Sequence, residues 1–302
     1  MEKPPLSKTL SGVIAAVATP IDENGAPDLK RATDLARYLL DNGCDGLNVL
    51  GSTGEATSFS RDERKAVMDA YKKNGLPLER LMVGTGAASV SDAVALTKHA
   101  AELGFGGALV LPPFYYKGLP DDGLVNYIEA LVKATADTKL PIYLYHYPQL
   151  SGLQWHVPLI KRLRESFPSR IVGLKDSSGD MAFARSAAAV GKDFAVFPST
   201  EACLLDARSG EFAGCISATA NLNADLCARA WRDGDAAALD AAVTIRKLFE
   251  GRQLVSGVKA LLSHIHGDAA LARVRPPLAP FAAADRTAVF AGYDAVRAKK
   301  VA

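Results

Sequence analysis

The sequence predicts an α/β fold, a (β/α)8 barrel (TIM barrel) with a C-terminal helical extension. Eight short apolar runs alternate with eight helical patterns between residues 13 and 232. Strands that alternate with helices indicate parallel pairing, and eight such units over this length are typical of the barrel. The alternative, a doubly wound open sheet, is weakened because no Gly-x-Gly-x-x-Gly fingerprint follows the first apolar run.

Each expected strand is a short apolar run bounded by turn residues. The first closes on Thr19-Pro20, and the runs lie at about 13–18, 46–50, 81–84, 107–111, 141–145, 171–174, 194–197 and 214–218. The helical patterns lie at about 28–41, 61–73, 91–103, 121–137, 156–166, 180–190, 201–209 and 223–232. The first helix carries one apolar stripe, formed by Leu29, Leu35, Leu39 and Leu40, and Asn42-Gly43 ends it.

The C-terminal part of the chain is expected to form extra helices that pack on the barrel. Residues from about 235 to 302 are rich in alanine and keep a helical periodicity, which glycines and the Pro-rich loop 276–280 interrupt. We therefore assign residues 1–233 to a barrel with the active site at its strand ends and residues 234–302 to the C-terminal helices.

Composition argues against several classes of partner. Of 302 residues, 49% are hydrophobic and 23% charged, and the formal net charge is +2 without long runs of either sign. We expect a globular protein that does not bind nucleic acid or a membrane. No apolar run reaches transmembrane length, and residues 1–9 do not resemble a signal peptide. The four cysteines lack CxxC spacing, so we expect reduced thiols in a cytoplasmic protein and no metal site.

The most informative anomaly is a lysine at the end of an apolar strand. The run Ile171 to Leu174 leads directly into Lys175 and then into a polar turn. Lysine is almost never fully buried without a purpose, and burial favours its neutral amine. A neutral amine can attack a ketone and form a Schiff base. The alternative is that Lys175 reaches out of the strand end or pairs with Asp176.

Two loops follow strand ends, where this fold carries its active sites. Residues 51–55 read Gly-Ser-Thr-Gly-Glu, and their backbone N–H groups and hydroxyls suit a carboxylate or phosphate. An ordinary glycine-rich turn with a capping hydroxyl is the alternative. Residues 112–117 hold three consecutive aromatic side chains, for which aromatic packing or a subunit interface is an alternative to a role in the site.

The fifth expected strand places tyrosines on one face. By the strand period of two, Tyr143, Tyr145 and Tyr147 share a face, and His146 points the other way. If Tyr145 faces the barrel axis, its phenol stands near the strand end that carries Lys175. We then expect His146 to be a packed or hydrogen-bonded histidine and not a base.

Together these features predict Schiff-base chemistry on a 2-oxo acid. The lysine would take the ketone carbon, the Gly-Ser-Thr loop would take the carboxylate, and the tyrosine would relay protons. The sequence shows no Ser–His–Asp arrangement, no metal-ligand cluster and no Walker loop.

On these residues the chain resembles the dihydrodipicolinate synthase / N-acetylneuraminate lyase family. The similarity covers nearly the whole chain, with matching segments at Thr19-Pro20, residues 51–55, Tyr145, residues 173–175 and residues 214–221. It implies a (β/α)8 barrel with C-terminal helices, assembled as a homotetramer that is a dimer of dimers. It also implies no metal or organic cofactor, only the covalent lysine imine with the substrate.

The resemblance assigns catalytic roles by position. Lys175 would be the Schiff-base lysine, and Tyr145 the general acid/base that also orients the carboxylate. Ser52 and Thr53, in the loop that begins at Gly51, would complete the proton relay and bind the carboxylate of the 2-oxo acid.

Four further positions are candidates. Tyr115 would be a relay tyrosine that reaches into the neighbouring subunit's site. Ile216 and Ser199 would line the pyruvyl pocket. Ser177 would either meet a substrate hydroxyl or cap the helix that follows it, with Asp180 three residues on.

The sequence departs from the family where the substrate is chosen. Dihydrodipicolinate synthases carry an arginine five residues after the tyrosine, which binds the carboxylate of aspartate semialdehyde, and here Leu150 takes that place. Loss of such a charge-assisted pair typically costs orders of magnitude in rate. The acidic pair with which sialic acid lyase grips its polyol appears as Glu201-Ala202, and its later serine as Ala218. We therefore expect a neutral or hydroxylated distal part, as in a 2-keto-3-deoxy sugar acid.

The expected function is a class I aldolase, a lyase that forms or cleaves a 2-oxo acid from pyruvate and an aldehyde. Three alternatives stay open. The first is 4-hydroxy-tetrahydrodipicolinate (dihydrodipicolinate) synthesis with a replacement cation such as Lys117. The second is a dehydratase or deaminase that uses the same lysine imine. The third is a non-catalytic binding barrel, which the fold alone does not exclude.

Overall fold

The computed structural model describes residues 10–299, and its strands form one parallel sheet. The strands are β1 (Gly12–Ala16), β2 (Gly46–Val49), β3 (Leu81–Gly84), β4 (Gly107–Val110), β5 (Ile142–His146), β6 (Ile171–Asp176), β7 (Ala195–Pro198) and β8 (Gly214–Ser217). They pair in the order β7-β6-β5-β4-β3-β2-β1-β8. The N–H of Ala213 donates to the carbonyl oxygen of Val196 at 3.0 Å and links the two outer strands. The barrel that the sequence predicts is confirmed.

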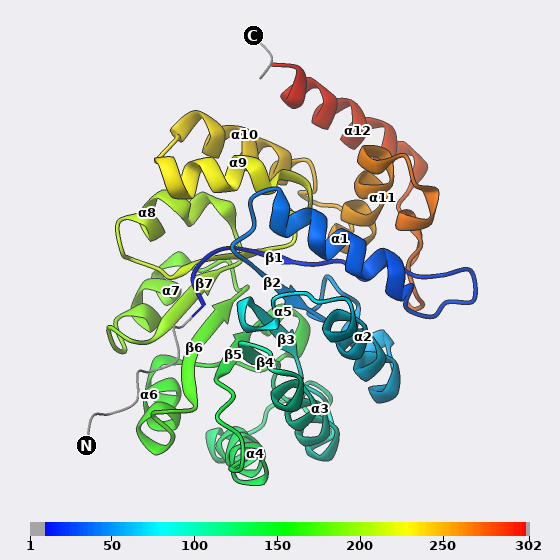
Figure 1. Ribbon diagram of the computed structural model, residues 1–302. Helices are drawn as coiled ribbons and strands as arrows, with labels where there is room; N and C mark the ends of the chain where they lie inside the picture. Colours follow the sequence, from blue (N-terminus) through cyan, green and yellow to red (C-terminus); the bar gives the residue numbers. More distant parts are fainter. Residues whose placement is uncertain (1–9, 300–302) are drawn as a thin grey trace.

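Helices cover the outside of this barrel, and Figure 1 shows them as a ring around the strands, except for the short α5, which lies over the strands in this view. They are α1 (Leu29–Asp41), α2 (Arg61–Lys73), α3 (Val90–Leu103), α4 (Asp121–Ala134), α5 (Pro148–Ser151), α6 (Val157–Ser166), α7 (Met181–Ala188), α8 (Leu204–Arg208) and α9 (Ala220–Asp233). Short 3-10 turns lie at η1 (Ala56–Ser58), η2 (Leu78–Arg80) and η3 (Glu201–Cys203). The sequence pattern did not predict α5, a single turn, and it predicted η3 and α8 as one helix.

The apolar stripe expected for α1 includes one residue, Leu29, that does not pack on the barrel. Leu29 is the first residue of the helix and is 38% exposed, whereas Leu35 and Leu39 are buried. Asp28 precedes it and accepts a hydrogen bond from the N–H of Arg31, so the first turn belongs to the polar cap. Packing against the barrel begins one turn later.

Side chains fill the barrel interior in layers. Each odd-numbered strand contributes one large inward-facing residue to the same layer: Ile14, Met82, Tyr143 and Phe197. Each pairs in register with one inward-facing residue of an even-numbered strand: Ile216 with Ile14, Asn48 with Met82, Leu109 with Tyr143 and Lys175 with Phe197. Because alternate strands supply the four side chains of one layer in this fold, Asn48, Leu109, Lys175 and Ile216 share a layer. We name these four residues the lysine layer.

Glycines make room beneath the lysine layer. On each even-numbered strand the inward-facing position two residues earlier is a glycine, namely Gly46, Gly107, Gly173 and Gly214. A Cβ atom on Gly107 or Gly173 would lie 2.6 Å from the ring of Tyr143. The glycines therefore let the large side chains of the lower layer, Tyr143 among them, fill the barrel.

The C-terminal extension consists of α10 (Ala236–Lys247), α11 (Leu254–His266), η4 (Ala269–Ala272) and α12 (Ala283–Ala298). α10 packs on α9, and α12 packs on α10 and α11. Figure 1 shows α11 beside α1, where the rings of Tyr38 and His266 meet edge to face at 4.6 Å. Arg297 of α12 pairs with Asp225 of α9 at 2.8 Å. The expected packing of extra helices on the barrel is observed, while the division of the chain at residue 233 stays a prediction.

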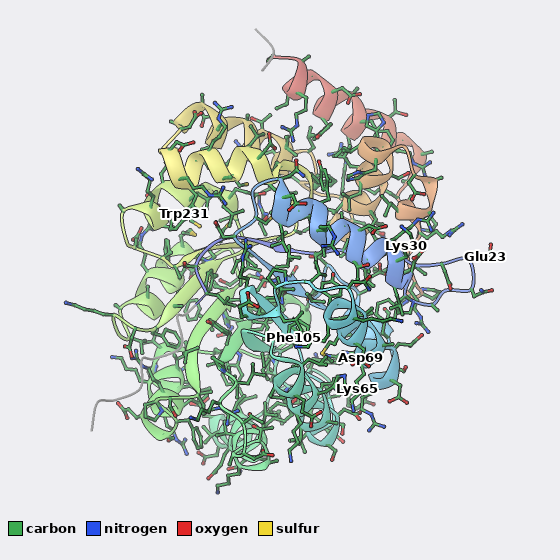
Figure 2. All side chains as sticks on the ribbon, in the orientation of Figure 1. Glu23, Lys30, Lys65, Asp69, Phe105 and Trp231 are labelled. Carbon is green, nitrogen blue, oxygen red and sulfur yellow. The ribbon has the colours of Figure 1, made fainter. Side chains whose placement is uncertain are left out.

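The outer faces of the helices are charged. Figure 2 shows Lys30 on α1 and Lys65 and Asp69 on α2 at the outside of the molecule. Within residues 10–299, none of the helices combines the length and the apolar character needed to span a bilayer.

Candidate active site

Lys175 lies inside the barrel near the C-terminal end of β6. Its side chain is 3% exposed, and its Nζ lies 3.3 Å from the Oη of Tyr145 and 4.4 Å from the centre of the Tyr145 ring. Asp176 faces away and accepts hydrogen bonds from the backbone N–H and the Oγ of Ser178. The two alternatives for Lys175, a side chain that reaches out to solvent and a pair with Asp176, are therefore wrong.

Tyr145 joins the lysine to the loop after β2. It pairs in register with Lys175 across β5 and β6, which brings the two side chains to the same end of the barrel. Its ring is 4% exposed, and its Oη lies 3.2 Å from the Oγ of Ser52. Amine, phenol and hydroxyl thus form one hydrogen-bonded chain along which a proton can move.

The loop at residues 51–55 is tightly wound. Leu50 and Glu55 both have a positive φ of about 55°, a region that non-glycine residues adopt at a cost of roughly 1–3 kcal/mol. Gly51 allows close packing, since a Cβ there would lie 2.5 Å from the Oδ1 of Asn48. Among the hydrogen bonds of residues 10–299, none is donated by the backbone N–H of Ser52 or Thr53. These two N–H groups can therefore donate to a carboxylate.

A buried ion pair holds the end of this loop. The Nζ of Lys259 on α11 contacts the carboxylate of Glu55, and the two side chains are 1% and 0% exposed. Lys259 also donates to the carbonyl oxygen of Thr19 at 2.9 Å, and Glu55 accepts from the N–H of Arg275 at 2.8 Å. Burial lowers the pKa of Lys259, and Glu55 opposes that shift. The C-terminal extension therefore takes part in shaping the loop.

Three further residues expected in the site, Ile216, Ser199 and Ser177, lie in different places relative to Lys175 and Tyr145. Ile216 is fully buried in the lysine layer. Ser199 is half-buried after β7, where its N–H donates to the carbonyl oxygen of Asp176 at 2.8 Å. Ser177 is half-buried at the end of β6, and its N–H donates to the carbonyl oxygen of His146. The capping role considered for Ser177 is wrong, because Asp180 caps α7.

Tyr115 does not reach the cluster of its own chain. It lies in the loop after β4 and is 75% exposed, and its ring packs edge to face against Tyr116 at 5.3 Å. Tyr116 is 68% exposed. The structure therefore leaves two neighbouring aromatic side chains on the surface.

His146 is a packed residue, as expected. It lies on the outer side of β5, 4% exposed, with its ring 4.4 Å from that of Phe183. Its Nδ1 accepts the N–H of Trp155 at 3.1 Å. Burial lowers the pKa of His146 to about 4, so its neutral form predominates near pH 7.

Leu150 stands at the rim of the barrel on α5, with 59% of its surface exposed. Lys117 reaches the same short helix, and its Nζ donates to the carbonyl oxygens of Phe114 at 2.5 Å and Ser151 at 2.7 Å. The ammonium group of Lys117 thus approaches α5 from the loop at residues 112–117, which we call the aromatic loop. It is bound to neutral acceptors and not to an acid.

Glu201 and Arg246 form a second polar cluster after β7 and β8. Glu201 is fully buried, and Arg246 of α10 approaches its carboxylate at 3.4 Å and the Oγ of Ser217 at 3.3 Å. Asn223 donates to the same carboxylate at 3.2 Å, and Thr219 also contacts it. Because protein groups surround Glu201, it is not free to grip a polyol.

Three residues of this region were not predicted from the sequence: Asn48, Lys259 and Arg246. Lys259 alone had a local signal, a single charge inside the apolar run 258–262. The other two are recognised only through their neighbours in space. In the part of the chain that the structure describes, no group of three or more His, Cys, Asp or Glu residues could hold a metal ion.

Comparisons with known proteins agree with this fold. The model of the dihydrodipicolinate synthetase family matches residues 9–295. An uncharacterised DapA-like lyase of Chloroflexus aurantiacus is 32% identical over 95% of this chain and 97% of its own length. The crystal structure of dihydrodipicolinate synthase from Agrobacterium tumefaciens superposes with a TM-score of 0.89 and 28% identity, covering 94% and 99% of the two chains. A prophage protein of the same family from E. coli, in complex with pyruvate, gives 0.85 and 26% over 95% and 98%.

Proposed function

Because this chain belongs to the dihydrodipicolinate synthetase family of carbon–carbon lyases, we propose that it forms or cleaves a 2-keto-3-deoxy sugar acid through an imine on Lys175. The observation that carries the proposal is the hydrogen-bonded chain from Lys175 Nζ through Tyr145 Oη to Ser52 Oγ. The similar E. coli protein whose structure contains pyruvate supports a 2-oxo acid as ligand.

In the direction of cleavage, the amine of Lys175 attacks the ketone carbon, and water leaves as the iminium forms. The phenol of Tyr145 gives its proton to the departing hydroxide, which leaves as that water, and the resulting phenolate then takes the proton of the C4 hydroxyl. The C3–C4 bond breaks, its electron pair moves into the iminium to give an enamine, and the aldehyde departs. Protonation at C3 and hydrolysis release pyruvate and restore the amine. Ser52 passes protons to and from Tyr145.

The backbone N–H groups of Ser52 and Thr53 would bind the carboxylate of the 2-oxo acid. A carboxylate bound there needs fixed donors, because a buried carboxylate is costly without them. Ile216 and Ser199 would line the pyruvyl pocket, while Ser177 would meet a hydroxyl group of the substrate.

The neutral distal part of the substrate is inferred from the rim of the barrel. Leu150 offers no charge for a second carboxylate, and the charge of Arg246 is balanced by Glu201. A distal carboxylate would therefore lose its hydration without a dedicated cation, which is costly. A polyhydroxy tail has no such requirement.

Dihydrodipicolinate synthesis is the second candidate, and Lys117 is the observation that favours it. Its Nζ lies 2.7 Å from the carbonyl oxygen of Ser151, one residue beyond Leu150, so it is placed to meet a carboxylate at the rim. The relative from Agrobacterium tumefaciens carries the name of this activity. The two candidates share the imine and differ in the outer pocket.

A substrate panel separates the candidates. We expect kcat/KM for a neutral 2-keto-3-deoxy acid to exceed that for condensation of pyruvate with aspartate semialdehyde by at least about tenfold, or roughly 1.4 kcal/mol. Leu150→Arg should narrow or reverse this ratio, and Lys117→Met should leave it unchanged. If the wild type condenses pyruvate with aspartate semialdehyde efficiently and Lys117→Met abolishes this activity, the protein is a dihydrodipicolinate synthase and our proposal is wrong.

The same panel distinguishes the aldolase from a dehydratase, a deaminase and a non-catalytic barrel. Loss of water or ammonia from a hydroxylated 2-oxo acid without release of an aldehyde would identify a dehydratase or deaminase. Failure of every 2-oxo acid to form an imine would leave a non-catalytic barrel.

We further propose that the protein is a cytoplasmic homo-oligomer with reduced thiols. The thiols support the cytoplasmic location, since Cys44, Cys203, Cys215 and Cys227 are all buried and form no disulfide.

A further inference from the structure

The side chain of Asn48 is fully buried, and neither its amide nitrogen nor its amide oxygen has a hydrogen-bond partner in residues 10–299. Buried polar groups in native proteins are almost always paired, and an unpaired one destabilises the fold. An apolar residue would remove that cost, as Leu109 and Ile216 do in the same layer. Among residues 10–299, no protein group supplies a partner for the amide.

The position of Asn48 relates it to Lys175. The two residues belong to the lysine layer, and in the strand order β2 and β6 lie four strands apart in either direction. They therefore project into the barrel from opposite sides, and an eight-stranded barrel is just wide enough for its interior side chains to meet. The Nζ of Lys175 is drawn toward the end of β2, because Tyr145 Oη bridges it to Ser52.

The surroundings of the amide show where its partner would stand. It lies directly beneath Gly51, since a Cβ built there would be 2.5 Å from Asn48 Oδ1 and 3.8 Å from Nδ2. Met82, its register partner, is apolar and belongs to the layer below. Toward the C-terminal ends of the strands, the polar groups are Lys175, Tyr145 and the loop that carries the backbone N–H groups of Ser52 and Thr53.

We propose that Asn48 is a substrate-binding residue that contacts the carboxylate of the 2-oxo acid once that acid is attached to Lys175. The inference rests on the proposed imine chemistry and adds a contact to it. The amide nitrogen donates to one carboxylate oxygen from inside the barrel, while the N–H groups of Ser52 and Thr53 donate from the C-terminal end. Because no protein group holds the amide within residues 10–299, it can turn its nitrogen toward the ligand.

This assignment predicts opposite effects of one substitution on stability and on binding. Asn48→Leu has nearly the same volume and removes the unpaired amide, so the free enzyme should melt at a higher temperature. The pyruvate concentration for half-maximal borohydride trapping should rise about tenfold or more. Because the contact is present in both the bound ground state and the transition state, KM should rise while kcat changes less than about threefold.

The test is a pyruvate titration of borohydride trapping on the full chain, followed by intact mass. Wild type, Asn48→Leu, Asn48→Asp and the control Met82→Leu are compared. Met82→Leu changes an apolar neighbour at nearly constant volume and should stay within about twofold of wild type. Asn48→Asp should impair trapping more than Asn48→Leu, because it sets one carboxylate against another.

The outcomes are distinguishable. Trapping of wild type together with an unchanged titration for Asn48→Leu would overturn the assignment of Asn48 and leave the proposed function intact. Absence of trapping in wild type would overturn the proposed function and this contact with it. If Asn48→Leu does not fold, Asn48→Ala must show the same shift, and an unchanged Asn48→Ala would equally overturn the assignment.

Discussion

Single residues in this barrel have environments that alternate along the strands. Tyr145 and Lys175 face the interior, while their neighbours His146 and Asp176 lie on the other side of the sheet in separate hydrogen-bonding arrangements. The period of two in a strand was enough to predict this separation. The consequence is that the buried histidine affects the stability of the fold and not the chemistry of the site.

Acid should therefore destabilise the protein partly through His146. Burial lowers the pKa of this imidazole from 6.5 to about 4, while the unfolded chain keeps the ordinary value. Between these values the unfolded state binds more protons, so the free energy of unfolding falls as the pH falls from about 6.5 toward about 4. From pH 7 to pH 5 we expect a loss of about 2 kcal/mol from this residue.

Urea unfolding of wild type and His146→Gln at both pH values measures this loss. Glutamine keeps an acceptor for the N–H of Trp155 and does not titrate. The free energy of unfolding of His146→Gln should therefore depend less on pH than that of the wild type. Burial raises the pKa of Asp176, which acts in the opposite sense, but Asp176 is common to both proteins and cancels in the comparison. Equal slopes in the two proteins would refute the role given to His146.

At the scale of elements, the loop after β2 depends on a helix far away in sequence. Glu55 closes the loop, and its partner Lys259 comes from α11, 204 residues later. Thr19 joins the arrangement through its Oγ1, which donates to the carbonyl oxygen of Gly54 at 2.9 Å. The extension thus fixes the strained segment on which Ser52 and Thr53 stand.

Removal of one partner of this buried pair should affect both stability and binding. Lys259→Met leaves the carboxylate of Glu55 without its cation, and such a change typically costs roughly 3–5 kcal/mol. We expect a lower melting temperature and a higher KM for the 2-oxo acid, because the loop loses its anchor. Calorimetry and steady-state kinetics measure the two effects.

The double variant Glu55→Gln, Lys259→Met is the matched control, since it removes both charges. It should recover part of the lost stability. A Lys259→Met protein as stable as wild type would show that the pair does not hold the loop.

For the molecule as a whole, the aromatic loop stands out, because a single chain leaves its aromatic side chains exposed to solvent. Tyr115 and Tyr116 lie on the surface as a ring pair, and exposed apolar patches of this kind usually mark an interface. We predict at least a dimer in sedimentation, with Tyr115 buried near the contact. Tyr115→Lys should shift the protein toward monomer and reduce activity.

Leu29→Lys provides the control for this assembly. Leu29 is also apolar and 38% exposed, but it lies at the start of α1, away from the aromatic loop. Its substitution should leave the sedimentation coefficient unchanged. A fully active wild-type monomer would contradict the predicted assembly.

Much of this architecture could be predicted from the sequence, because each strand and helix has a local pattern. The strand expected at 81–84 and the helix expected at 61–73 match β3 and α2 residue for residue. The cluster of Lys175, Tyr145 and Ser52 could also be predicted, since the carboxyl ends of parallel barrel strands meet at one face. The roles of Asn48, Arg246 and Lys259 could not, because they depend on contacts between segments far apart in the chain, even though the charge of Lys259 stands out in its apolar run.

The central claim is that Lys175 carries the substrate, and one measurement tests it most directly. The full chain is reduced with borohydride in the presence of pyruvate and digested, and the modified peptide is located by mass spectrometry. We predict a reduced pyruvyl group on the side chain of Lys175, none in Lys175→Ala, and the same adduct as in wild type in Asp176→Asn. Absence of an adduct in wild type, or an adduct on another lysine such as Lys117 or Lys259, would contradict the role assigned to Lys175.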